Sequence, residues 1–106
     1  MVKIFITGGT IDKQYNPLNG ELIFAQSSLE DMLKQARSSV VIDLELLMLK
    51  DSLEMTDEDR DRLSKACNAS VEPKILITHG TDTMVESAHA IARTLAPNKT
   101  VVLLGA

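Results

Sequence analysis

Two short segments of the sequence place hydroxyl groups and a carboxylate directly after an apolar run. Residues 5–12 read Phe-Ile-Thr-Gly-Gly-Thr-Ile-Asp, and residues 77–83 read Ile-Thr-His-Gly-Thr-Asp-Thr. A threonine hydroxyl attacks a carbonyl carbon only after a neighbouring group removes its proton. If both apolar runs are strands of one parallel sheet, both segments lie at its carboxyl edge, where open α/β sheets bind ligands. The pattern predicts one site built from two turns.

The first turn, residues 7–10, has two interpretations that the sequence leaves open: an ordinary tight turn, or a cradle for an anion or an oxyanion. Its glycine spacing is that of neither a P-loop nor a dinucleotide-binding turn. A flavodoxin-like phosphate turn leads straight into a helix, whereas Asn-Pro at 16–17 and Asn-Gly at 19–20 are turn signals. We therefore expect residues 11–20 to form a loop that is poorly ordered without a ligand.

The second turn, residues 79–83, is more informative. Thr83 and Glu86 have the spacing of a capping box, so helix capping accounts for Thr83 and leaves Thr81 without a structural role. His79 is of the residue type that most often acts as a base. It precedes the turn, however, so a buried position in the sheet and a direct role in the site both remain open.

The elements that position these turns alternate between strands and helices. Apolar runs predict strands over residues 2–7, 40–49, 75–78 and 100–104, with a short strand or hairpin arm at 21–24. Capping signals at Ser27, Thr56 and Thr83 predict three helices, the last two ending near residues 69 and 95. This order predicts an α/β fold, a three-layer Rossmann- or flavodoxin-like domain with a mainly parallel sheet flanked by helices.

Two of these elements carry further detail. In the strand at 40–49, Asp43 and Glu45 interrupt one face, as expected toward an edge of the sheet. In the third helix, His89 falls on the polar side and is predicted to lie at the surface. The stripe that this helix is expected to bury consists of Met84, Ala88, Ile91 and Leu95, widened by Val85 and Ala92.

Composition narrows the class of ligand. The 106 residues suffice for one domain, the net charge is −4, and aromatic residues make up 3%. A nucleic-acid partner requires a basic face and stacking rings, and no apolar run approaches the roughly 20 residues that span a bilayer. We therefore expect a small polar ligand, with neither nucleic acid nor a membrane as partner. The single cysteine, Cys67, predicts a small apolar role on a helix and fits a reducing, cytoplasmic compartment.

The two turns together resemble the active-site motifs of bacterial-type L-asparaginases and glutaminase-asparaginases. Residues 7–11 are similar to the first motif of their N-terminal domain, and residues 78–83 to the second. Residues 51–56 (Asp-Ser-Leu-Glu-Met-Thr) resemble the segment between, and residues 101–106 the strand after. The resemblance covers the whole chain in order. It implies a single N-terminal domain over residues 1–106, without the family's C-terminal part and second domain, that uses no cofactor and self-associates as a homo-oligomer.

The resemblance also implies a reaction and its residues. Thr10 is the expected nucleophile, which attacks the side-chain amide carbon of asparagine or a related amide and forms an acyl-enzyme. Tyr15, on the loop, is expected to orient or activate Thr10. Thr81 and Asp82 are expected to bind substrate and help to position water, and Asp82 also to meet the substrate α-ammonium group. Ser52 is expected to hold the α-carboxylate.

Backbone N–H groups of the two turns, which contain Gly9 and Gly80, are expected to stabilise the oxyanion. The chain also departs from the family pattern, because Leu53 stands where a polar residue is common and Asp12 where a small one is usual. The family's catalytic lysine follows the last strand, and no motif supports Lys13 or Lys50 as its substitute.

Two alternatives to an amidohydrolase domain remain open. One is a non-catalytic domain of the same descent that binds a small amino acid or amide. The basic residue that is missing from the site separates this interpretation from an enzyme. The other is a flavodoxin-like binding module, which a flavin chromophore would reveal.

Overall fold

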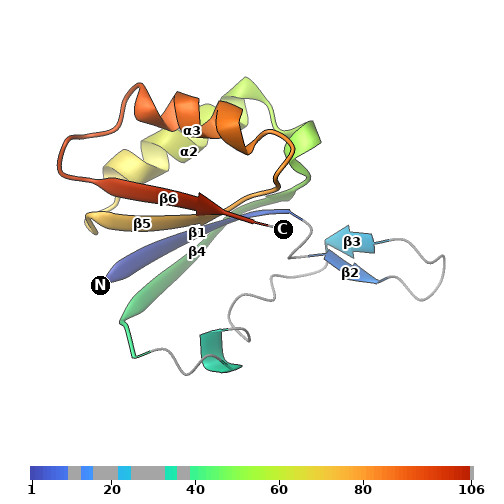
Figure 1. Cartoon of the computed structure of the whole chain (residues 1–106), viewed down its shortest axis with the longest axis horizontal. Helices are drawn as coiled ribbons and strands as arrows, with labels where there is room; N and C mark the ends of the chain where they lie inside the picture. Colours follow the sequence, from blue (N-terminus) through green and yellow to red (C-terminus); the bar gives the residue numbers. More distant parts are fainter. Residues whose placement is uncertain (10–12, 16–21, 25–32, 36–38, 106) are drawn as a thin grey trace.

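A computed structural model of the chain describes residues 1–9, 13–15, 22–24, 33–35 and 39–105, with no account of side chains in 13–15 and 22–24. Four parallel strands form one sheet in the order β4-β1-β5-β6, and two short strands form an antiparallel hairpin, β2-β3 (Figure 1). The predicted α/β class is therefore confirmed. The strands are β1 (Val2–Gly8), β2 (Lys13–Tyr15), β3 (Leu22–Phe24), β4 (Ile42–Lys50), β5 (Lys74–Thr78) and β6 (Thr100–Leu104), and the helices are η2 (Ser52–Glu54), α2 (Asp57–Ala69) and α3 (Met84–Ala92).

Helices cover both faces of the sheet. The helices α2 and α3 lie on one face (Figure 1), where Leu63 and Ile91 pack with Phe5 and Ile77 of the strands. Residues 33–35, part of the helix expected after Ser27, are helical, and Leu33 packs on the other face against Ile4 and Ile6. This arrangement confirms the three-layer prediction.

The strand β1 is central, and its apolar residues are buried on both faces of the sheet. The strand β4 lies at an edge, as the two acidic residues on one of its faces predict. These carboxylates accept hydrogen bonds from the buried Lys3 of β1, with its Nζ 2.8 Å from Asp43 Oδ2 and 3.0 Å from Glu45 Oε1. The polar face of β4 is thus explained by a charge on its neighbour.

The pairing of β1 with β4 contains an irregularity at the carboxyl edge. Ile6 pairs with Leu46, but Gly8, two residues further along β1, pairs with Lys50. Such a bulge bends a strand and re-aims its residues. It brings the end of β4 against the glycines that end β1.

The helix α2 begins as predicted at Thr56, which forms a complete capping box with Asp59. The Asp59 carboxylate accepts from Thr56 N at 2.9 Å and from Lys50 Nζ at 2.8 Å. Burial alone raises the pKa of this carboxyl group, but the bonds from Lys50 and Thr56 outweigh burial and hold the pKa below its ordinary value of 3.8.

Replacing Asp59 with alanine is expected to lower the free energy of unfolding by about 1–3 kcal/mol at pH 7, because a cap and a buried ion-pair partner are lost together. Since the folded pKa is lower than the unfolded pKa, this contribution is complete above pH 3.8 and is lost as the pH falls through the folded value. Urea titrations at pH 7 and pH 3 measure it. Glu58→Ala, an exposed carboxylate of the same turn, is the control, and equal losses in both variants would contradict the assignment.

The start of α3 differs from its prediction. The capping box at Thr83 is wrong: its side chain caps no helix N–H and instead donates to Ser52 O at 2.8 Å. The prediction that Val85 and Ala92 widen the buried stripe of this helix is also wrong, since both residues are exposed. They lie about 100° around the helix from the buried Ile91 side, where Ser87 is buried instead.

The hairpin occupies part of the segment expected to be a loop. Lys13–Tyr15 pairs antiparallel with Leu22–Phe24, which confirms a hairpin arm at the latter and corrects the loop prediction for the former. These three residues show no alternation, so only the partner strand reveals them as a strand. The rest of the predicted loop, and its expected disorder, lies outside the described residues.

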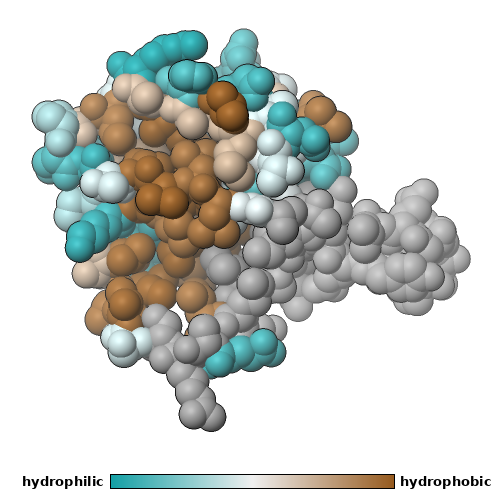
Figure 2. Space-filling model, in the orientation of Figure 1, coloured by the Kyte–Doolittle hydropathy of each residue, from teal (hydrophilic) through white to brown (hydrophobic). Residues whose placement is uncertain are grey.

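Figure 2 shows hydrophobic residues gathered over the strands, with hydrophilic residues on the outer side of the helices. Val102 and Leu104 of the edge strand β6 are 52% and 40% exposed. Among the described residues, no helix is long and apolar enough to cross a membrane.

Candidate functional site

The two glycines that end β1 bring the first turn against the second. Gly8 and Gly9 have φ of +112° and +94°, which side chains other than hydrogen rarely adopt. Gly9 N donates to Lys50 O at 3.2 Å. A Cβ atom on Gly9 would lie 2.9 Å from Gly80 N and 3.1 Å from His79 C. The two turns therefore touch, backbone to backbone, at the carboxyl ends of the adjacent strands β1 and β5.

Ser52 closes the other side of the second turn. A Cβ atom on Gly80 would lie 2.9 Å from Ser52 Oγ and 3.0 Å from its Cβ. Thr83 bonds the same serine twice, since its N–H donates to Ser52 Oγ at 3.3 Å and its Oγ1 donates to Ser52 O. The structure thus brings together three of the predicted site residues, Gly9, Gly80 and Ser52, from three separate segments.

The remaining predicted site residues are placed only in part. Thr81 and Asp82 follow Gly80 and are exposed, and their side chains make no hydrogen bond or ion pair to any described residue. Tyr15 lies in β2, and its side chain is outside the described part of the structure, as is Thr10 altogether. A shared cleft for the Thr10 and Thr81 hydroxyls therefore stays a prediction.

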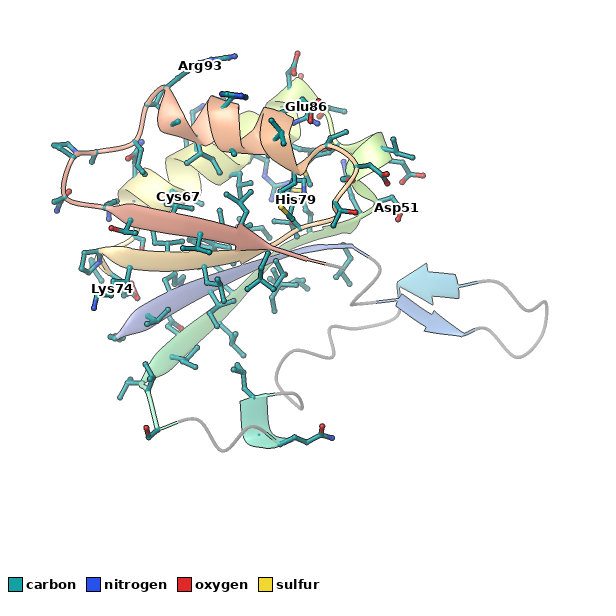
Figure 3. All side chains as sticks on the ribbon, viewed as in Figure 1. Asp51, Cys67, Lys74, His79, Glu86 and Arg93 are labelled. Carbon is teal, nitrogen blue, oxygen red and sulfur yellow. The ribbon has the colours of Figure 1, made fainter. Side chains whose placement is uncertain are left out.

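His79 lies beneath the second turn rather than in it. It is fully buried, and Figure 3 shows it between the sheet and α3. Its Nδ1 is 2.6 Å from Gly80 O, and its Nε2 is 2.8 Å from Ser87 Oγ. Burial lowers the pKa of the imidazole, and the nearby Arg60 lowers it further although the bond to Gly80 raises it. The open question about His79 is answered in favour of the buried position.

The sequence interpretation missed Ser87. It is fully buried, and its Oγ accepts from Arg60 Nε at 3.1 Å. The available signal was its position: a serine three residues after Met84 and four before Ile91 falls on the apolar stripe of α3. A polar residue at such a position requires a buried partner.

Two other side chains of the domain are engaged or poorly reactive. Lys50 Nζ lies 2.8 Å from Asp59 Oδ2, so this side chain is already engaged in an ion pair. Burial raises the pKa of the Cys67 thiol to about 11, which supports its predicted role as a small apolar residue. Within the described ranges, no group of three or more His, Cys, Asp or Glu side chains could hold a metal ion.

The structure is an α/β domain whose candidate site lies at the carboxyl edge of the sheet, where two glycine-containing turns and the buried Ser52 meet. The sequence profile of the asparaginase N-terminal domain matches residues 1–106. The chain therefore belongs to the asparaginase family, and it corresponds to the N-terminal domain of that family.

Similar proteins of known sequence or structure are also described as L-asparaginases. The chain is 33% identical over 111 residues to a probable periplasmic L-asparaginase of Haemophilus influenzae, covering 99% of this chain and 32% of that protein. The thermostable L-asparaginase of Thermococcus kodakarensis superposes with a TM-score of 0.81 at 27% identity, covering 98% of this chain and 33% of the other. A probable cytoplasmic L-asparaginase of Campylobacter jejuni gives 0.80 at 33% identity, covering 98% and 34%. The chain spans about a third of the length of these relatives.

Proposed function

We propose that this chain carries the nucleophile and the substrate-binding part of an amidohydrolase site that hydrolyses the side-chain amide of L-asparagine or a related amide. One observation carries the proposal: Gly9, Gly80 and Ser52 are in contact at one edge of the sheet, in a chain of the asparaginase family. These residues belong to the segments that resemble the family's active-site motifs.

The proposed reaction has two steps. The Thr10 hydroxyl, oriented by Tyr15, loses its proton as its oxygen bonds to the amide carbon; the C–N bond then breaks, and the amide nitrogen takes up a proton and leaves as ammonia. The resulting ester on Thr10 is then hydrolysed by water, which Thr81 and Asp82 help to position, giving the carboxylic acid and free Thr10. Preorganised N–H groups of the two turns stabilise the oxyanion in each step, at about 3–4 kcal/mol per donor.

Substrate binding uses side chains around the second turn. The exposed Asp82 meets the α-ammonium group, and its lack of partners among the described residues leaves its carboxylate available. Ser52 Oγ accepts from Thr83 N–H, so the Ser52 hydroxyl hydrogen is available to the substrate α-carboxylate. Gly9 N–H already donates to Lys50 O. The oxyanion donors are therefore other N–H groups of the turns.

Isolated residues 1–106 are expected to release ammonia from asparagine very slowly or not at all, while retaining affinity for aspartate. A general base contributes about 10²–10⁴-fold to such a rate, and nothing in these 106 residues matches the family's catalytic lysine. The assays are ammonia release, with Thr10→Val as control, and calorimetry with L-aspartate. Robust turnover that Thr10→Val abolishes would contradict the expectation and identify another base.

Aspartate binding without turnover is the result expected here, and the second candidate, a non-catalytic domain that binds a small amino acid or amide, predicts the same result. The absence of binding as well as turnover would exclude both candidates for this chain. We also propose a cytoplasmic location, which the single, buried and free Cys67 supports, and a homo-oligomer, in which a neighbouring copy completes the site.

A further inference from the structure

The positions of the protons around His79 follow from its partners. Gly80 O is a carbonyl oxygen and can only accept, so Nδ1 of the imidazole carries a proton and donates to it over 2.6 Å. Because the imidazole is fully buried and neutral, Nε2 carries a lone pair and must accept. The tautomer is thereby defined.

The donors and acceptors beyond Nε2 can be assigned in the same way, as far as Arg60 of the helix α2. Arg60 Nε can only donate, so Ser87 Oγ accepts from it over 3.1 Å. The Ser87 hydroxyl hydrogen then donates to Nε2, 2.8 Å away, in preference to Met55 Sδ at 3.6 Å. The same sulfur also lies 3.1 Å from Nε2, but a thioether sulfur is only a weak acceptor and has no proton to donate. One continuous chain of donors runs from Arg60 through Ser87 and His79 to the Gly80 carbonyl.

The last bond of this chain determines the orientation of a peptide group in the candidate site. In a trans peptide the C=O and N–H bonds point in opposite directions, and the structure contains no cis peptide among its described residues. Since the Gly80 carbonyl points to His79 in the interior, the N–H of Thr81 points away from the interior. That N–H makes no backbone hydrogen bond to a described residue.

We propose that Ser87 and Arg60 are positioning residues, which act through His79 to hold the Gly80–Thr81 peptide with its N–H facing the ligand. The Thr81 N–H is the donor that this chain presents to a carboxylate or a developing oxyanion. The identity of that ligand rests on the proposed function, whereas the orientation of the peptide does not.

The test uses the full chain labelled with ¹⁵N. Ser87→Ala is compared with Ser64→Ala, a matched buried serine of α2 whose Oγ bonds to Ala90 O outside this chain of donors. NMR reports the protonation of each His79 nitrogen, the exchange rate of the Nδ1 proton and the Thr81 amide shift, and calorimetry reports L-aspartate binding. Arg60→Met is compared in the same way with Arg62→Met, whose parent side chain donates to Leu47 O, away from this chain of donors.

In the wild type we expect a proton on Nδ1 and none on Nε2. Ser87→Ala is expected to speed exchange of the Nδ1 proton about tenfold, to shift the Thr81 amide signal and to raise the dissociation constant for aspartate about tenfold. Arg60→Met is expected to change the same three quantities less, and both controls to change none. Urea midpoints show whether any variant is merely unstable.

A protonated Nε2 in the wild type would overturn the proposal, as would responses in Ser87→Ala or Arg60→Met that match their controls. If the wild type does not bind aspartate while the exchange rate and the Thr81 shift respond as expected, the proposed function fails and the positioning role stands. If aspartate binds equally to Ser87→Ala and Ser64→Ala, the positioning role fails and the proposed function stands.

Discussion

A Gly8→Ala variant is expected to lose about 3 kcal/mol or more of its free energy of unfolding, the largest loss from any single added methyl group in β1. Two costs combine at this position. The φ of +112° is unfavourable for any L-residue with a side chain, and the added Cβ would lie 2.6 Å from both the N and the O atoms of Lys50. These are backbone atoms of a paired strand, so no side-chain rotation relieves the contact.

Urea unfolding followed by circular dichroism measures this loss. Lys74→Ala, at an exposed position of the neighbouring strand β5, is the control and is expected to stay within about 0.5 kcal/mol of the wild type. An unchanged urea midpoint for Gly8→Ala would show that β1 does not end in the left-handed conformation against Lys50.

Gly80→Ala is expected to weaken aspartate binding about 100-fold or more, a loss of roughly 2.8 kcal/mol of binding free energy. The added Cβ would lie 2.9 Å from Ser52 Oγ and 3.1 Å from Ser52 N, so the second turn and the Ser52 segment must separate. Separation breaks both Thr83 bonds to Ser52 and moves the proposed donors apart.

A second substitution distinguishes this steric effect from a general loss of structure. Ser52→Gly in the Gly80→Ala background removes the Ser52 Cβ and Oγ, so it is expected to recover much of the stability. It is not expected to recover binding, because the proposed carboxylate donor is gone. A double variant that binds aspartate like the wild type would exclude Ser52 from the site.

The sequence was sufficient to predict those elements whose local pattern agrees with their environment. The helix α2 is the best example, because its capping box at Thr56 and its acidic first turn are local features that the structure retains. The place of β4 at an edge also followed from sequence, since Asp43 and Glu45 interrupt one of its faces and so predict that this face is only partly covered.

The sequence was insufficient where a distant segment competes for a local group. Thr83 has a capping-box neighbour, yet its hydroxyl bonds to Ser52, which is 31 residues away. The β2 strand is a strand only because Leu22–Phe24 pairs with it. In the candidate site, the two motifs predicted turns that the structure brings into contact, whereas the donor chain beneath them depends on α2 and α3 packing together.

The pairing of β1 has a consequence for how the chain folds. The strand β1 bonds to residues far away in the sequence. Lys3 bonds to Asp43 of β4, 40 positions away, and Thr7 Oγ1 donates to Thr78 O of β5, 71 positions away. Contacts this distant in sequence give a high contact order, and such topologies fold slowly. During synthesis the first strand leaves the ribosome early but gains its second neighbour only after about three quarters of these residues have been made. Until then one edge of this strand lacks its partner, so the strand that leads into the first turn of the candidate site is completed late in synthesis.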